Sequence, residues 1–278
     1  MNKFFWRAIQ ENNYAIPVDH TPTSLTAELF EYLGSTDPEL RDQIAYDTFA
    51  NFLKRDYYSP EEIAIYITSL MANLEIGIGE SETDSVFLRS FSVLFLAEII
   101  NNDNKVPHLK KPIIKTILEK VLWYIEAERD PRGYVIGKGW AHALAHTADL
   151  LLVLGKNLNT GAREHNRILN GISKKLLQST DWVYLHGEDD RLSRAVLEIF
   201  HRGTLPAAFV KKWLGSFLNP GPDSWKGAWL EEESARAFFN VRNFMRSLYL
   251  QVVTEDELPL QKELEKLVLG TVQKLRPY

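Results

Sequence analysis

The chain has 278 residues, of which 45% are hydrophobic, so it is long enough to bury a sizeable core. Its 32 lysines and arginines are outnumbered by 37 aspartates and glutamates, and it has no long basic run, which argues against a nucleic-acid-binding surface. It has no cysteine, which excludes disulfides and thiolate metal sites.

Almost every segment shows the hydrophobic period of a helix, and no convincing strand alternation occurs. Thr36-Asp-Pro-Glu39 predicts a helix that ends near Lys54. Ser59-Pro-Glu-Glu62 predicts the next start, because serine caps a helix while proline and acidic residues favour its first turn. We expect a break at Asn219-Pro-Gly-Pro222 and further helix starts near Thr83, Lys111, Gly139, Thr160, Asp190, Leu205, Leu230 and Asp256.

These starts recur at intervals that give one helical hairpin in roughly 40–55 residues, close to the ~40–47 residues of HEAT and armadillo repeats. We therefore expect an all-α protein with a single domain over residues 1–278. Its antiparallel helical hairpins would stack into a HEAT- or armadillo-like curved superhelix. No charge-free apolar stretch approaches the ~20 residues of a membrane helix, so we expect a cytoplasmic protein that contacts no membrane.

The most distinctive segment leads from a glycine-containing loop into a predicted helix that carries His142, His146 and Asp149. A helix turns about 100° per residue, which places these three side chains on one stripe. The two histidines have the spacing of the zinc-protease helix motif, but Ala143 stands where that motif has its glutamate base. They could bind a divalent metal, with Asp149 as third ligand or orienting group, or shuttle protons. They could equally be buried structural residues.

The loop before this helix offers a second kind of contact. Lys138 and the free backbone amides of a helix start would suit an anionic group, and Trp140 would lie beside it. The alternative is a tight returning loop in which Trp140 is a hydrophobic plug.

Two arginines occur in closely similar apolar settings. Phe87-Leu-Arg-Ser-Phe91 contains Arg89, and Phe244-Met-Arg-Ser-Leu248 contains Arg246. A buried guanidinium keeps its proton and must find a carboxylate, a carbonyl or a ligand anion. Asp149 and Glu188-Asp-Asp190 are candidate partners, and a substrate anion could bridge both arginines. The alternative is a pair of interhelical salt bridges, or arginines whose heads reach water.

The segments Gly137–Asp149, Phe87–Phe91 and Asn240–Tyr249 resemble a bacterial family known as domain of unknown function 2785. The resemblance extends over about residues 40–255. It implies a helical, HEAT-like fold and no established activity.

Two kinds of function remain open. A polar pocket lined by His142, His146, Asp149, Arg89 and Arg246 could bind a small anionic ligand or a metal, and could catalyse hydrolysis. Alternatively, the chain is a helical-repeat scaffold that binds a protein partner on its concave face, and its histidines are structural. An enclosed cavity beside the histidines favours the first, and dry packing against a neighbouring helix favours the second.

Overall fold

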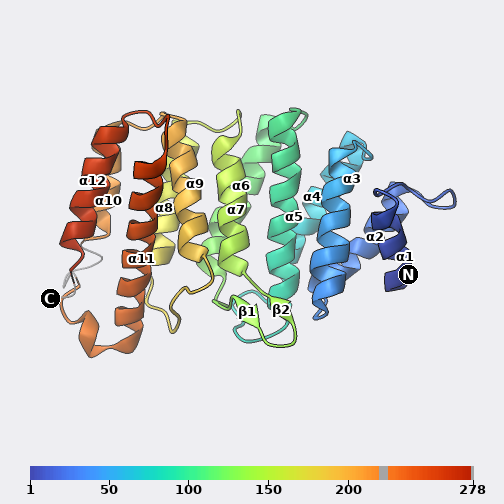
Figure 1. Ribbon diagram of the computed structural model, residues 1–278, viewed down its shortest axis with the longest axis horizontal. Helices are drawn as coiled ribbons and strands as arrows, with labels where there is room; N and C mark the ends of the chain where they lie inside the picture. Colours follow the sequence, from blue (N-terminus) through green and yellow to red (C-terminus); the bar gives the residue numbers. More distant parts are fainter. Residues whose placement is uncertain (219–224, 277–278) are drawn as a thin grey trace. The chain divides into compact units, whose positions relative to one another are not determined.

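The computed structural model describes residues 1–218 and 225–276, and the regular secondary structure of this part of the chain is helical apart from one two-stranded hairpin (Figure 1). The all-α prediction is confirmed. The α-helices are α1 (Lys3–Glu11), α2 (Pro22–Glu31), α3 (Asp47–Lys54), α4 (Pro60–Asn73), α5 (Ser85–Lys105), α6 (Lys111–Ala127), α7 (Ala143–Lys156), α8 (Ala162–Leu176), α9 (Glu188–His201), α10 (Ala207–Ser216), α11 (Glu232–Thr254) and α12 (Gln261–Lys274). Short helical segments η1 (Tyr32–Gly34), η2 (Glu39–Tyr46) and η3 (Ala228–Leu230) and the strands β1 (Tyr134–Val135) and β2 (Gly139–Trp140) complete the fold.

The chain divides into two compact units. The first unit consists of Met1–Ile113 and Ala127–Leu150, and the second of Ile114–Glu126 and Leu151–Tyr278. All candidate site residues except Arg246 belong to the first unit.

Capping chemistry explains the best-predicted helix start. Ser59 Oγ accepts a hydrogen bond from the Glu62 amide at 3.2 Å, and the Glu62 carboxylate accepts one from the Ser59 amide at 2.7 Å. This capping box, with Pro60 in the first turn, fixes the start of α4 where it was predicted. The predicted start at Lys111 is also confirmed, and most others lie within a few residues of an observed start. The predicted break at Asn219–Pro222 lies outside the described residues.

The helix predicted to begin near Glu39 and end near Lys54 is present, but its first half is the π-helical segment η2, which continues as α3. A π-helical turn is wider than an α-helical turn and is rare outside single bulges. In η2 it carries Arg41, whose side chain is fully buried.

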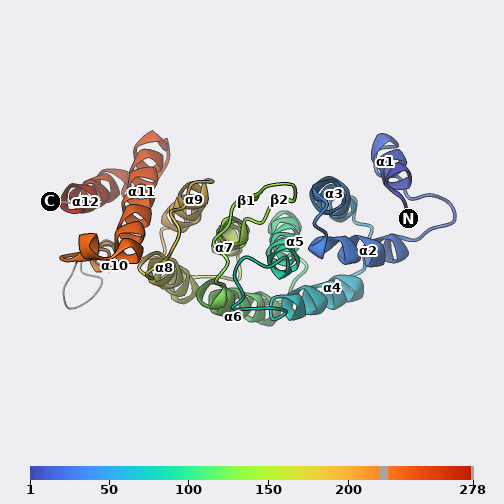
Figure 2. The same ribbon diagram turned by 90° about the horizontal axis from the view of Figure 1, so that it is seen from below.

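Helix α5 lies at the centre of the first unit, and Figure 2 shows it between α3 and α7. Phe95 of α5 stacks on Phe49 of α3 with ring centroids 4.6 Å apart. Among the described residues, α5 alone is long and apolar enough to cross a membrane, yet 67% of its apolar window is buried within the protein. The apolar composition of α5 is therefore used to form the protein core.

In the second unit, the apolar core contains polar groups that form hydrogen bonds. Trp213 packs edge-on against Phe244 and donates its indole N–H to the Leu169 carbonyl at 2.8 Å. His165 is fully buried, with Nε2 3.0 Å from the Gly155 carbonyl and Nδ1 2.6 Å from the Thr204 hydroxyl. Burial lowers the pKa of His165, so this side chain is a neutral structural link.

Candidate functional site at the β1–β2 hairpin

The segment before α7 is a β-hairpin and not the irregular loop expected from the sequence. Tyr134 pairs with Trp140 and Val135 with Gly139 in antiparallel register. Two further backbone hydrogen bonds, from Ala141 to Gly133 and from His142 to Arg132, continue the pairing toward α7. Each strand has only two residues, which is too short to show an alternating pattern in the sequence.

His142 lies outside the predicted helical stripe. Helix α7 begins at Ala143, and His142 precedes it with a left-handed backbone at φ +51°. Its carbonyl accepts the first helical hydrogen bond, from the His146 amide at 2.9 Å. Its ring stacks on Trp140 with a centroid distance of 4.2 Å. The prediction that both histidines share a helix with the geometry of the zinc-protease motif is therefore wrong at His142.

His146 connects α7 to α5. Its Nδ1 lies 2.8 Å from Ser90 Oγ, and the Ser90 hydroxyl also contacts the Ala141 carbonyl. A carbonyl can only accept, so the serine donates to Ala141 and receives the Nδ1 proton of His146. Ser90 is fully buried and His146 nearly so, with the ring edge against Phe91. This serine–histidine pair therefore holds the end of the hairpin against α5.

The two histidine rings meet edge to face, with centroids 5.7 Å apart. In the described parts of the chain, no group of three or more histidine, cysteine, aspartate or glutamate side chains is placed to hold a metal ion. Asp149 is half-buried, and its negative charge acts on Tyr46. Burial, together with the charges of Glu98 and Asp149, raises the pKa of Tyr46.

Arg89 is fully buried and bound to Glu128, a residue that the sequence did not suggest. Nε and Nη2 of Arg89 donate to the two Glu128 carboxylate oxygens at 2.6 and 2.9 Å. Nη1 donates to the carbonyls of Ile76 and Gly77 and to the Ser85 hydroxyl, at 2.8–3.0 Å. The proposed partners Asp149 and Glu188–Asp190 are thus corrected to Glu128, and the guanidinium fastens the loop after α4.

The other two cationic candidates are placed differently. Arg246 lies on α11 in the second unit, where its side chain is exposed, so its apolar sequence neighbours do not bury it. Lys138, at the hairpin turn, contacts both carboxylate oxygens of Asp84 at 2.6 and 2.7 Å. The anion-binding roles suggested for these two residues remain predictions.

Arg41 also supports the hairpin, and the sequence analysis did not identify it as a site residue. Its Nη2 donates to the Lys138 carbonyl at 2.9 Å, and its Nη1 donates to the Ser35 carbonyl at 2.6 Å. The guanidinium carbon lies 4.3 Å from the ring centre of Phe87 and 4.7 Å from that of Phe91. Burial lowers the pKa of Arg41, but an arginine so placed is still charged at neutral pH. The sequence feature that could have indicated Arg41 is an arginine within the helix predicted between Thr36 and Lys54.

The outer side of the hairpin is apolar and accessible. Tyr134, Ile136 and Trp140, called here the hairpin patch, are 52%, 92% and 40% exposed. Tyr134 and Trp140 touch edge to face with centroids 5.0 Å apart. On the inner side, Val135 packs against a buried cluster that includes Phe87 and Ala141. The hairpin therefore presents apolar side chains to solvent from a firmly bonded base.

A family model described as a protein of unknown function (DUF2785) matches residues 74–250, more than half of the chain. The matched range includes the hairpin and all the candidate site residues. No curated protein and no solved structure matches the chain.

Proposed function

This chain belongs to the DUF2785 family, and from its site geometry we propose that it binds a protein partner through the β1–β2 hairpin. The observation that carries the proposal is the hairpin patch. Its three large apolar side chains project from the hairpin, and Ile136, the first residue of the turn, is 92% exposed. Accessible aromatic and aliphatic groups on a rigid support are typical anchors of protein interfaces.

The support beneath the patch favours binding because it limits the entropy lost on association. Arg41 donates a hydrogen bond to the Lys138 carbonyl, and the Lys138 ammonium forms an ion pair with Asp84 at the start of α5. At the base of the hairpin, Arg132 is bound to Asp130 and to the Thr83 carbonyl. The patch would therefore meet a partner with its backbone already ordered.

The bonding of the candidate polar residues favours this function over a catalytic pocket. The Arg89 guanidinium donates to a carboxylate and to three further oxygens. Ser90, which would be the nucleophile beside His146, is fully buried. Binding and hydrolysis of a small anion require groups that can turn toward a substrate, whereas Arg89 is bonded to Glu128 and to the loop after α4, and Ser90 and His146 are bonded to each other.

The test uses a photo-reactive amino acid at position 136 in the full-length protein inside cells. Ile65 on α4 is the matched control, because it is an isoleucine of the same unit and is also well exposed. We expect one defined protein to be crosslinked from position 136 and not from position 65. The purified partner should then lose at least tenfold in affinity for the Ile136→Asp variant, and an unchanged melting temperature should show that the fold is intact.

Two results would overturn the proposal. One is an equal set of crosslinked proteins from positions 65 and 136. The other is an Ile136→Asp variant that binds the purified partner within twofold of the affinity of the native chain.

A further inference from the structure

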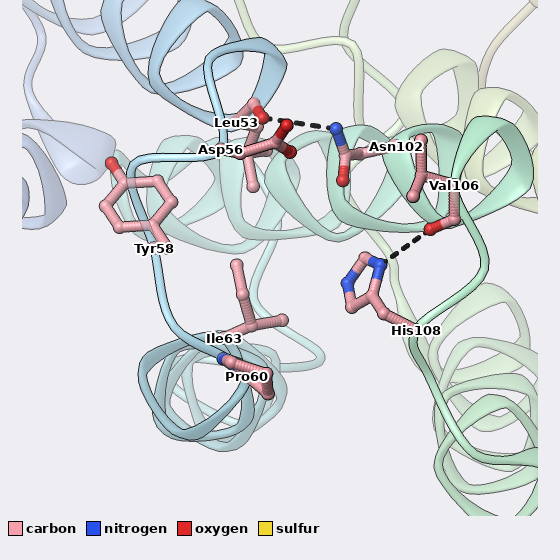
Figure 3. Close-up of a pocket in the computed structure, with 8 residues that line it drawn as sticks. All are labelled: Leu53, Asp56, Tyr58, Pro60, Ile63, Asn102, Val106 and His108. Carbon is pink, nitrogen blue, oxygen red and sulfur yellow. Dashed lines mark hydrogen bonds between the residues drawn. The ribbon is translucent and has the colours of Figure 1, made fainter.

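A small pocket lies in the first unit at the other end of α5 from the hairpin. Its volume is about 170 Å³, and it opens where α3 and α5 end and α4 begins. Figure 3 shows the eight lining residues, which are Leu53, Asp56, Tyr58, Pro60, Ile63, Asn102, Val106 and His108. None of them belongs to the site predicted from the sequence.

Two side chains that line the pocket donate hydrogen bonds to backbone carbonyls, and each retains an acceptor atom. Nδ1 of His108 lies 2.9 Å from the Val106 carbonyl and 3.6 Å from a carboxylate oxygen of Asp103, so Nδ1 carries a proton. In the neutral tautomer that places its proton there, Nε2 is an acceptor. In Figure 3 the Nε2 side of the ring points into the pocket. The Asn102 amide nitrogen donates to the Leu53 carbonyl at 3.2 Å, which leaves the Asn102 amide oxygen as an acceptor.

The electrostatic environment of the pocket is mainly negative. The pocket contains the exposed carboxylate of Asp56 and lies at the carboxyl ends of two helices, where the helix dipole is negative. The amino end of α4 opposes this effect at Pro60, but Glu62 caps that end with its carboxylate. The lysines in the last turns of α3 and α5 do not line the pocket.

The remaining walls are apolar. They are formed by Leu53, Tyr58, Pro60, Ile63 and Val106. A dry cavity of ~150 Å³ holds a molecule as large as benzene, so a pocket of this size accepts a short hydrocarbon chain. The matching ligand has an apolar stem and a compact, positively charged group that donates hydrogen bonds.

We propose that this pocket binds a primary alkylammonium group. Its ammonium donates to the Asp56 carboxylate, the Asn102 amide oxygen and His108 Nε2, and its carbon chain lies on the apolar walls. A primary ammonium has three donors and no acceptor, which matches three acceptors in the pocket. Free amines and lysine side chains share this chemistry.

Titration of the full chain with 1,5-diaminopentane, followed by NMR chemical shifts, tests the proposal. We expect saturable shifts at the pocket with a dissociation constant on the order of 1 mM for so small a ligand. Asp56→Asn should weaken binding about tenfold, because it removes the charged acceptor. Asn tolerates the left-handed backbone of Asp56, at φ +53°, so this variant should fold. Asp19→Asn, at another exposed aspartate of the same unit, is the matched control.

Further ligands and one further variant distinguish the proposed chemistry from general apolar binding. His108→Phe should also weaken diamine binding, while tetramethylammonium and 1-pentanol should not displace the diamine. Nα-acetyl-lysine amide, titrated in parallel, shows whether a lysine side chain or a free amine binds more tightly. The proposal fails if neither amine gives saturable shifts at 20 mM, if 1-pentanol competes, or if Asp56→Asn binds as tightly as Asp19→Asn.

Discussion

Arg89 and Arg41 show how single residues stabilise buried charge in this fold. Arg89 is paired with the Glu128 carboxylate and Arg41 with the Asp42 carboxylate, and Arg41 also contacts two phenylalanine rings and donates to two carbonyls. Removing one partner of a buried ion pair is costly because the other charge is left without compensation.

Glu128→Gln should lower the free energy of unfolding by about 3 kcal/mol, since it leaves the Arg89 guanidinium buried against a neutral amide. The double variant Arg89→Met with Glu128→Leu should be less destabilised than Glu128→Gln, because it removes both charges. Urea unfolding measures both variants against the native chain. A Glu128→Gln protein within about 0.5 kcal/mol of the native chain would contradict the assigned role of this ion pair.

His165 should make stability depend on pH. Its folded pKa lies below its ordinary value because it is buried, so the unfolded chain binds the proton first. The free energy of unfolding should be highest above about pH 6.5 and should fall as the pH drops from there toward the folded pKa. Urea unfolding between pH 5 and 7.5 measures this slope. The slope should shrink in His165→Gln and persist in His20→Gln; equal slopes in both would refute the assignment.

The sequence could place Arg89 in an apolar helix, but it could not identify the partner. Glu128 is 39 positions away and reaches Arg89 only through the path of the chain after α6. Arg246 has similar local neighbours and is nevertheless exposed. Burial depends on which helix face meets another element, and a local pattern of five residues does not determine that face.

At the scale of elements, the predictable features were those set by local chemistry. The α4 start follows from Ser59 and Glu62, which bond to each other within one turn. The start of α7 does not follow from local chemistry, because His142 before it has a left-handed backbone and donates its amide to the Arg132 carbonyl across the hairpin. The π-helical form of η2 likewise has no established sequence signal, and α1 and α2 were not predicted.

Gly139 and Gly137 provide a matched test of how tightly the hairpin is held. Both have φ +77°, so alanine at either position costs about 1 kcal/mol for its backbone conformation. A Cβ at Gly139 would also lie 2.8 Å from Pro38 and 3.1 Å from Arg41 Nη2, while one at Gly137 meets nothing within 4 Å.

We therefore expect Gly139→Ala to lose about 3 kcal/mol of stability and Gly137→Ala about 1 kcal/mol. Denaturant unfolding measures the difference. Hydrogen exchange should also show the hairpin amides opening faster in Gly139→Ala than in Gly137→Ala. Equal losses in the two variants would mean that the Arg41 contact does not constrain the hairpin.

At the scale of the molecule, helical periodicity was sufficient to predict an all-α chain, since that signal is repeated in almost every segment. The division into two units was not predictable, because its boundaries fall near the two ends of α6 and in the middle of α7 and not in a loop. Contacts of distant segments create that division, and no composition shift marks it in the sequence.

The two proposed binding places lie at opposite ends of α5, whose 21 residues span about 30 Å. Changes that far apart, with no shared partner, usually act independently. We expect Ile136→Asp to leave the affinity for 1,5-diaminopentane unchanged, and Asp56→Asn to leave the affinity for the hairpin's partner unchanged. In the double variant the affinity for each ligand should equal that of the single variant that weakens it, to within about 0.5 kcal/mol, by calorimetric titration. A larger coupling energy would mean that α5 transmits binding between its ends, and that the hairpin and the pocket form one functional site.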